Sequence, residues 1–171
     1  MREILFRGKR KDSGEWVEGG YYCEKIGEYI TAAFIAENLT SQVIGHERVV
    51  AETVGQFTGL TDRNGNKIFE GDILKQKTTD EFAKVNPFKW ERYGVVRFGC
   101  YDWNDDYAGN TTMGWYIEHL KSVAIQPKNY CVGCIQHGLN QSDILNEYYP
   151  MEVIGNIHDN PELISGDGNA D

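Results

Sequence analysis

The chain lacks a long apolar segment, and it has no surplus of positive charge. No apolar stretch approaches the ~20 residues that a membrane-spanning helix requires, and Met1–Phe6 is too short for a signal peptide core. We therefore expect a cytoplasmic protein whose four cysteines stay reduced. The net charge of −9 argues against direct nucleic-acid binding, because neutralising phosphates requires excess lysine and arginine. The short basic run Arg7–Lys11 could contact phosphate, but we interpret it as a solvated turn.

The chain also lacks the short motifs that identify common enzymes. The phosphate-binding pattern G-x-x-x-x-G-K-S/T is absent, and so are G-x-G-x-x-G after a strand and the G-x-S-x-G elbow. The four histidines are isolated, and each is interpreted as a surface or packed residue: His46, His119, His137 and His158. We therefore predict that the protein is not an enzyme and needs no cofactor.

The chain contains few prolines and many aromatic residues. Ten Tyr, seven Phe and four Trp against four Pro favour strands over helices, and nineteen Gly indicate many turns. One helical turn is expected at Ile35–Leu39 and a short helix at Gln141–Tyr149, with Ser142 as its N-cap. The expected strands are Ile4–Arg7, Trp16–Cys23, Tyr29–Phe34, Val49–Phe57, Ile68–Gln76, Tyr93–Gly99, Gly114–His119 and Met151–Ile157.

The segment Thr58–Leu74 is the most informative part of the sequence. Asn64-Gly65 suits a two-residue type I′ turn, which needs positive φ at both central positions. Asp62 and Asn66 flank this turn with side chains that can bond the nearby backbone. Glu70-Gly71-Asp72 then interrupts the following extended run. The segment has the chemistry of a β scaffold, and no catalytic group is evident in it.

This segment, TGLTDRNGNKIFEGDIL, closely resembles the YopX family of phage and prophage proteins. Met1–Arg7 and Glu152–Leu163 resemble the opening and the close of the same family. The resemblance implies a small, soluble, mostly β protein encoded in bacteriophage DNA or prophage DNA of Gram-positive bacteria, without naming a reaction. It assigns a structural role to the motif residues Gly59, Asp62, Asn64, Gly65, Phe69, Gly71 and Asp72.

We predict a mainly β fold with few short helices. An N-terminal β meander (residues 1–57) is expected to pack with a small SH3-like antiparallel barrel (58–164), which carries a variable insertion at about 100–150. The SH3-like expectation is a fold-level analogy with the opening of such barrels, and it says nothing about a ligand. Residues 165–171 are expected to form a disordered tail.

One candidate metal site stands out. Cys131 and Cys134 form a C-x₂-C pair that could bind zinc, and His137 could supply a third ligand. No second pair follows at a recognisable spacing, so a fourth ligand would have to come from elsewhere. We favour the alternative that the two cysteines act as small hydrophobic residues and that His137 is solvated.

An aromatic cluster suggests how the protein acts. These rings are interleaved with acids and glycines, and they suit either a barrel core or an interface: Tyr101, Trp103, Tyr107, Trp115 and Tyr116. Our leading hypothesis is a non-enzymatic protein-binding or assembly module that self-associates, with an unidentified protein partner. The alternatives are an acidic nucleic-acid mimic that occupies a host DNA-binding protein, and a small zinc-dependent enzyme.

Overall fold

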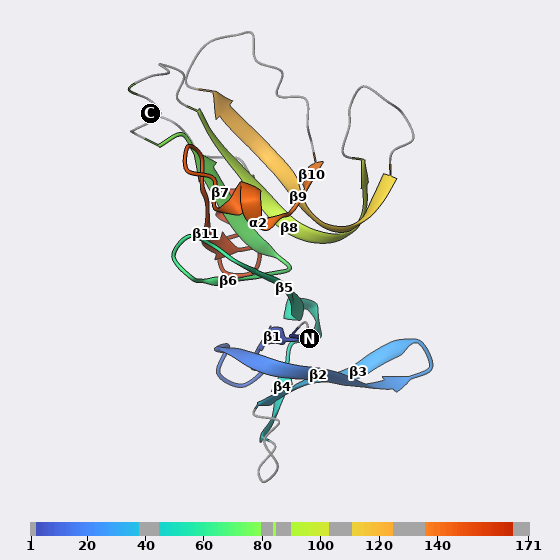
Figure 1. Ribbon diagram of the computed structural model, residues 1–171. Coiled ribbons are helices and arrows are strands. Elements are labelled where there is room, and N and C mark those ends of the chain that lie inside the picture. Colours follow the sequence, from blue (N-terminus) through green and yellow to red (C-terminus); the bar gives the residue numbers. More distant parts are fainter. Residues whose placement is uncertain are drawn as a thin grey trace. The chain divides into compact units, whose positions relative to one another are not determined.

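The computed structural model describes residues 3–37, 45–79, 84, 90–102, 111–124 and 136–165. Most of these residues lie in antiparallel strands, and the helices are few and short, which confirms the mainly β class (Figure 1). The chain divides into two compact units, Met1–Gly59 and Leu60–Asp171. Whether they correspond to the predicted domains of residues 1–57 and 58–164 stays a prediction.

Unit 1 is a single antiparallel sheet with a short 3-10 turn. Its strands follow the spatial order β4-β3-β2-β1-β5, so the first four are joined in simple up-and-down fashion. Their inward side chains form one core of Val17, Ala33, Ile35 and Val49. The elements are β1 (Phe6–Lys9), β2 (Trp16–Ile26), β3 (Tyr29–Glu37), β4 (Gly45–Val49), η1 (Ala51–Thr53) and β5 (Gly55–Thr61), whose last residues continue into unit 2.

Strand β4 returns to the end of β1, so the sheet of unit 1 curls partly closed. Arg10 and Val49 form an isolated antiparallel bridge. The Lys11 N–H donates to the Arg48 carbonyl at 2.9 Å. One end of the outer edge of β4 is therefore already hydrogen-bonded within the unit.

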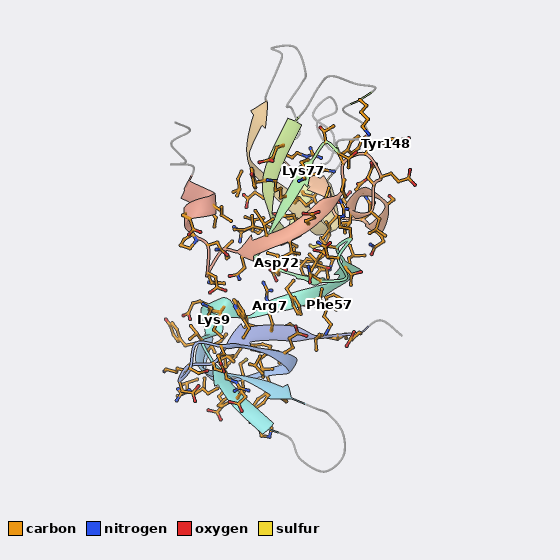
Figure 2. All side chains as sticks on the ribbon, turned by 90° about the vertical axis from the view of Figure 1, so that its left-hand side faces the viewer. Arg7, Lys9, Phe57, Asp72, Lys77 and Tyr148 are labelled. Atoms are coloured by element: carbon orange, nitrogen blue, oxygen red, sulfur yellow. The ribbon has the colours of Figure 1, made fainter. Side chains whose placement is uncertain are left out.

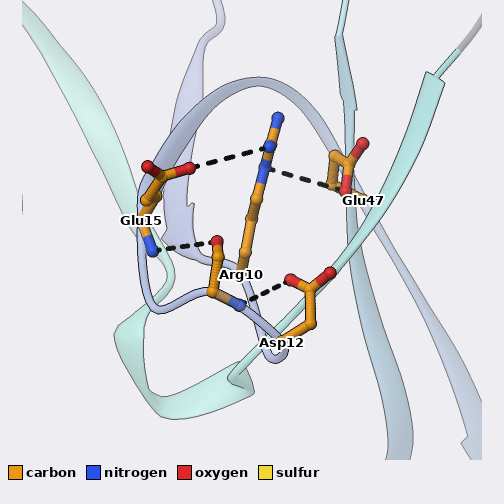
Figure 3. Close-up of polar contacts among 5 residues, drawn as sticks. Arg10, Asp12, Glu15 and Glu47 are labelled. Atoms are coloured by element: carbon orange, nitrogen blue, oxygen red, sulfur yellow. Dashed lines mark hydrogen bonds and ion pairs between the residues drawn. The ribbon is translucent and has the colours of Figure 1, made fainter.

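The Arg10 side chain supports this closure. Its guanidinium lies between Glu15 and Glu47, with N–O distances of 4.0 and 3.7 Å (Figure 3). The turn beside it is held by side chains, since Ser13 N–H donates to Asp12 Oδ1 and Glu15 N–H donates to Ser13 Oγ. The β1–β2 connection is thus held both by the ion pairs of Arg10 and by the side-chain hydrogen bonds within the turn.

The basic run Arg7–Lys11 is mostly strand and not the solvated turn of our interpretation, since only Lys11 lies in a turn. Figure 2 labels Arg7 and Lys9, which extend from β1. The Arg7 guanidinium lies 4.6 Å from the centroid of the Trp16 ring, and Lys9 Nζ lies 5.6 Å from it. The aromatic ring therefore offers both cations a partner inside the unit.

Two predictions in unit 1 are wrong. Val49–Phe57 is not one strand, because η1 interrupts it between β4 and β5. The buried Thr53 fixes this turn, since its Oγ1 donates to the Val50 carbonyl at 2.7 Å and accepts from Lys9 N–H at 2.9 Å. The helical turn predicted at Ile35–Leu39 is replaced by β3, which extends to Glu37, and residues 38 and 39 lie outside the described part.

Unit 2 is built around a second antiparallel sheet, with the order β10-β9-β8-β7-β11. In the described residues this sheet is not closed, so the SH3-like barrel is not confirmed. Its core contains Ile68, Leu74, Val96, Ile117, Ile144 and Met151. The elements are β6 (Lys67–Phe69), β7 (Asp72–Lys77), β8 (Trp90–Asp102), β9 (Thr111–Ala124), β10 (Gln136–Gly138), α2 (Gln141–Ile144), β11 (Met151–Asn156) and α3 (Glu162–Ser165).

The helix predicted at Gln141–Tyr149 is shorter than expected and has a different cap. The segment α2 ends at Ile144, and its N-cap is Asn140, whose side chain accepts from Asp143 N–H at 2.9 Å. Ser142, the predicted cap, lies inside the first turn and donates its hydroxyl to Asn140 Oδ1. No helix in the described ranges is long and apolar enough to cross a membrane. Ser165, the first residue of the predicted tail 165–171, is instead the last residue of α3, and the rest of that tail falls outside those ranges.

Candidate binding surface

The central motif is organised by one buried carboxylate. Asp62 is only 2% exposed, and its Oδ1 accepts from the N–H groups of Asn64 and Asn66 at 2.9 and 2.8 Å. Its Oδ2 accepts from Asn66 Nδ2 at 2.9 Å and from Val153 N–H at 3.2 Å. The expected side-chain-to-backbone bonding is confirmed for Asp62, and one of the bonds reaches β11, far along the chain.

The turn itself differs from the predicted type I′ turn. Gly65 N–H donates to the Asp62 carbonyl, and Asp62 N–H donates to the Asn66 carbonyl. The loop therefore has three residues, 63–65, closed by Asp62 and Asn66. Gly65 occupies its last position, with φ +84°. A three-residue hairpin loop commonly places a left-handed glycine at this position.

Gly65→Val is expected to lower the free energy of unfolding by about 1–2 kcal/mol, because a side chain is strained at this positive φ. No heavy atom lies within 4 Å of the position a Cβ would take, so the loss would report backbone conformation and not overlap. Gly65→Asn should keep most of the stability, since asparagine tolerates the left-handed region. Thermal unfolding of both variants tests this, and an unchanged Tm for the valine variant would contradict it.

The second turn of the motif, between β6 and β7, uses Asp72 in the same way. Asp72, which Figure 2 labels, is 1% exposed, and its Oδ2 accepts from Phe69 N–H at 2.8 Å. Gly71 has φ +83°, and its backbone bonds to both Val96 and Ile157. The predicted interruption at residues 70–72 therefore separates β6, which pairs with β5 in the first sheet, from β7, which belongs to the second sheet.

The closing motif is also a structural turn. Asn156 Oδ1 accepts from the N–H groups of His158 and Asp159 at 2.9 and 3.0 Å. Asn160 Oδ1 accepts from Asn156 N–H and lies 2.2 Å from where a Cβ on Gly155 would be. These residues hold the end of β11 in a fixed turn, and no catalytic role is needed to explain them.

A cluster of ionisable side chains lies across β7 and β8. Lys75 Nζ is 2.8 Å from Glu91 Oε2, and the Tyr93 hydroxyl donates to the other oxygen of Glu91. The hydrogen bond to Glu91 raises the pKa of Lys75. Burial raises the pKa of Glu91, but hydrogen bonds from Lys75 and Tyr93 outweigh it and lower the pKa overall. Lysine and glutamate thus stay charged near neutral pH, as a cross-strand ion pair.

The predicted metal ligands cannot be placed. Cys131, Cys134 and the side chain of His137 lie outside the described residues, although the backbone of His137 forms part of β10. Within the residues that the structure does describe, no group of three or more His, Cys, Asp or Glu side chains is arranged to hold a metal ion.

A part of unit 1 that the motifs did not indicate exposes large apolar side chains. Strand β1 pairs with β2 only at Trp16–Gly19, and β4 pairs with β3 only at Ala33–Glu37. Residues 24–32 of the hairpin therefore extend beyond both neighbours, and we call them the β2–β3 arm (Figure 1). The arm turns at Gly27, whose φ of +62° suits a two-residue hairpin loop.

The tip of the arm is unusually apolar for an exposed hairpin. Ile26 is 74% exposed, Tyr29 82% and Ile30 46%. Ile26 and Tyr29 pair across the two strands, so they share one face of the sheet, whereas Ile30 pairs with Lys25 on the other face. Both strands were predicted from the sequence. The pattern of each strand taken separately did not indicate that the hairpin extends beyond β1 and β4.

The same face continues from the tip to β4 as a row of aromatic and charged residues. Tyr22 stacks on Phe34 with ring centroids 5.0 Å apart, and its hydroxyl lies 2.9 Å from His46 Nδ1. Arg48 pairs with Phe34 in the register, which puts it on this face too. We call this surface the aromatic face: Tyr22, Glu24, Ile26, Tyr29, Phe34, His46 and Arg48.

The predicted aromatic cluster of unit 2 is only partly described. Trp115 is partly buried against the core of unit 2, and its ring meets that of Phe98 edge-on with centroids 4.9 Å apart. Of the two expected roles, core or interface, Trp115 therefore has the core role. Tyr101 and Tyr116 stack at 5.2 Å. The other two members, at positions 103 and 107, lie outside the described residues.

Comparisons with known proteins bear on the family of this chain. The sequence profile described as YopX protein matches residues 5–165. One similar solved structure is the crystal structure of protein EF1440 from Enterococcus faecalis, with 24% identity and a TM-score of 0.48 over 96% of this chain and 99% of that chain. No curated protein matches the chain. The profile match takes in the central motif, the closing segment and the last three residues of the opening segment, and the chain belongs to the YopX family.

Proposed function

We propose that this protein is a non-enzymatic protein-binding or assembly module that binds its partner through the β2–β3 arm. The observation that carries this proposal is the exposure of Ile26, Tyr29 and Ile30 at the tip of a projecting hairpin. Grouped exposed apolar side chains commonly mark sites of interaction, whereas scattered ones need no explanation.

The physical argument is that the arm gains from being covered. A two-stranded ribbon with no further neighbour is only marginally stable in water. Fully burying one large apolar side chain is worth about 1.5–3 kcal/mol relative to leaving it exposed. A partner that covers the tip would therefore stabilise the ribbon and provide binding free energy from the same side chains.

The pairing of charges favours this proposal over the acidic nucleic-acid mimic. A mimic needs carboxylates that are gathered on one face and available to a cationic partner. In the described residues, many surface carboxylates instead meet cations of this chain: Glu15 and Glu47 with Arg10, Glu152 with Arg63, Glu91 with Lys75, and Glu118 with Arg97. The zinc-enzyme alternative would gain support from zinc bound near one ion per chain.

We propose that the protein acts in the cytoplasm of a bacterial cell whose genome or infecting phage encodes it. Family membership and the resemblance described above support this setting. Its partner is then another protein of that cell or of the phage, or a second copy of the chain.

The test is a pull-down with the tagged full-length chain from host lysate that also contains an untagged copy. Wild type is compared with Ile26→Lys/Tyr29→Lys, which changes two exposed residues, and with Met113→Lys, which changes a 65% exposed residue of unit 2. We expect wild type and Met113→Lys to retain a nuclease-resistant protein partner and the double variant to lose it. Equal recovery with all three baits, or no partner with any, would contradict the proposal.

A further inference from the structure

We infer that Asn64 is a site of spontaneous deamidation, and that hydrogen bonds to Asp62 restrain this reaction while the central hairpin is closed. The loop of residues 63–65 belongs to unit 2, whereas the β2–β3 arm belongs to unit 1. The modification site is therefore separate from the surface in the proposed function. It bears on how long the central motif keeps its covalent structure.

Deamidation is a reaction between the asparagine side chain and the backbone of the next residue. The backbone nitrogen of Gly65 attacks Cγ of Asn64, and the bond from Cγ to the amide nitrogen breaks. The proton of the Gly65 N–H leaves with that nitrogen as ammonia. Water then opens the cyclic succinimide at either carbonyl, which gives aspartate or isoaspartate. The reaction needs only water and consumes no oxidant, reductant or cofactor.

The position of Asn64 favours this chemistry. Both Asn64 and Gly65 are exposed, and Asn64 is the one asparagine of the sequence that precedes a glycine. No heavy atom lies within 4 Å of the position that a Cβ on Gly65 would take. Because glycine carries no side chain, its backbone nitrogen is open to close approach. By contrast, Asn160 precedes Pro161, which has no N–H to release.

The closed hairpin opposes the reaction through Asp62. The Gly65 N–H, which must give up its proton, donates to the Asp62 carbonyl at 3.1 Å. The Asn64 N–H donates to Asp62 Oδ1 at 2.9 Å, so the backbone of both reacting residues is held. The side-chain amide can therefore reach the Gly65 nitrogen only after the loop opens. Reactions of a transiently opened state follow the population of that state.

The modification would also weaken the closure that restrains it. Isoaspartate adds one methylene to the backbone between position 64 and Gly65, which would displace Gly65 within the loop that Asp62 and Asn66 close. Either product places a new carboxylate beside Asp62, whose own carboxylate is buried. Like charges repel, so the hydrogen bonds around Asp62 would form less well once the reaction has occurred.

The test is the rate of conversion at Asn64, measured by peptide mapping with mass spectrometry on full-length protein kept at mildly alkaline pH. Folded wild type is compared with Asp62→Ala, Gly19→Ala and wild type unfolded in urea. We expect Asp62→Ala to convert about tenfold faster than folded wild type or more, because hydrogen bonds to a charged group are lost. The chain in urea should convert fastest.

Gly19→Ala is the matched control, since it is expected to destabilise unit 1 while the hydrogen bonds of Asp62 in unit 2 remain. Its rate should stay close to that of folded wild type. Asn64→Gln should abolish the conversion of the peptide, because the longer side chain closes a ring far less readily. That result would assign the conversion to position 64 and not to Asn66.

Three outcomes would overturn the inference. Equal rates for wild type in buffer and in urea would mean that the hairpin does not restrain the reaction. No conversion in urea would mean that Asn64 is not a reactive site. Equal acceleration by Asp62→Ala and Gly19→Ala would mean that the whole chain must unfold first. If circular dichroism shows that Asp62→Ala is unfolded, Asp62→Asn takes its place in the same comparison.

Discussion

Replacing Asp62 with alanine is expected to lower the free energy of unfolding by about 3 kcal/mol or more. Hydrogen bonds to a charged group are each worth about 1.5–3 kcal/mol, and a buried donor left without an acceptor costs a further penalty. Asp62 accepts four such bonds, three from backbone N–H groups and one from Asn66 Nδ2. The change therefore removes the closure of the hairpin and its link to β11. Urea unfolding measures the loss.

Asp12 offers a matched control in unit 1. It also bonds a neighbouring backbone N–H, that of Ser13 at 2.7 Å, but its side chain is exposed. Asp12→Ala should therefore change the free energy of unfolding by less than about 1 kcal/mol, as is usual for surface positions. A similar decrease in the free energy of unfolding for Asp12→Ala and Asp62→Ala would show that the burial of Asp62 does not add to stability.

The same carboxylate makes part of the stability depend on pH. Burial raises the pKa of Asp62, but hydrogen bonds from Asn66, Val153 and Asn64 outweigh it, so the pKa in the folded protein is lowered. A group of this kind stabilises the fold above its unfolded pKa, about 3.9. That contribution is lost as the pH falls from there through the folded pKa. Wild type should therefore lose stability more steeply in this window than Asp62→Asn.

Gly19→Ala is expected to cost roughly 2–3 kcal/mol, near the upper end of what overpacking usually costs. A Cβ on Gly19 would lie 2.0 Å from the carbonyl oxygen of Ala36 and 2.7 Å from its carbonyl carbon. These are backbone atoms of β3, paired with both β2 and β4, so they cannot move without disturbing the sheet. Chemical unfolding of the variant measures the loss.

Gly45→Ala serves as the control for this second change. Gly45 lies in β4 of the same sheet, and no heavy atom lies within 4 Å of the position its Cβ would take. Its φ is not in the left-handed range, so alanine is tolerated there. We expect Gly45→Ala to be close to neutral. A loss equal to that of Gly19→Ala would mean that glycine matters in this sheet for a reason other than space.

The central hairpin illustrates how far local chemistry could be read. Aspartate and asparagine beside an Asn-Gly pair indicated a turn with side-chain-to-backbone bonds, and those bonds are present. The predicted position of the turn was wrong by one residue. The loop contains residues 63–65 and is closed by Asp62, whose side chain also accepts a bond from Val153 N–H. That contact spans 91 positions in the sequence, and no residue near the turn predicts it.

Smaller misassignments have the same origin. Asn140 and Ser142 are both good N-cap residues, and the capping role falls to whichever stands where α2 begins. The strand predicted across Val49–Phe57 is interrupted because Thr53 is buried against Lys9, a residue of another strand. In both cases several local choices were acceptable. A distant contact lies at each place, since Thr53 accepts from Lys9 N–H and Gln141 Nε2 donates to the Thr61 carbonyl at 3.1 Å.

The family, the mainly β class and the turns around Gly65, Gly71 and Asn156 could be predicted from the sequence, because these depend on residue types within a few positions of one another. Tertiary structure alone decided which carboxylate is buried, how far each strand is covered, and hence that the tip of the β2–β3 arm remains exposed. Burial is a property of neighbours in space, and strands that pair over long sequence separations supply those neighbours. The candidate binding surface therefore emerged from strand lengths and register, and not from a motif.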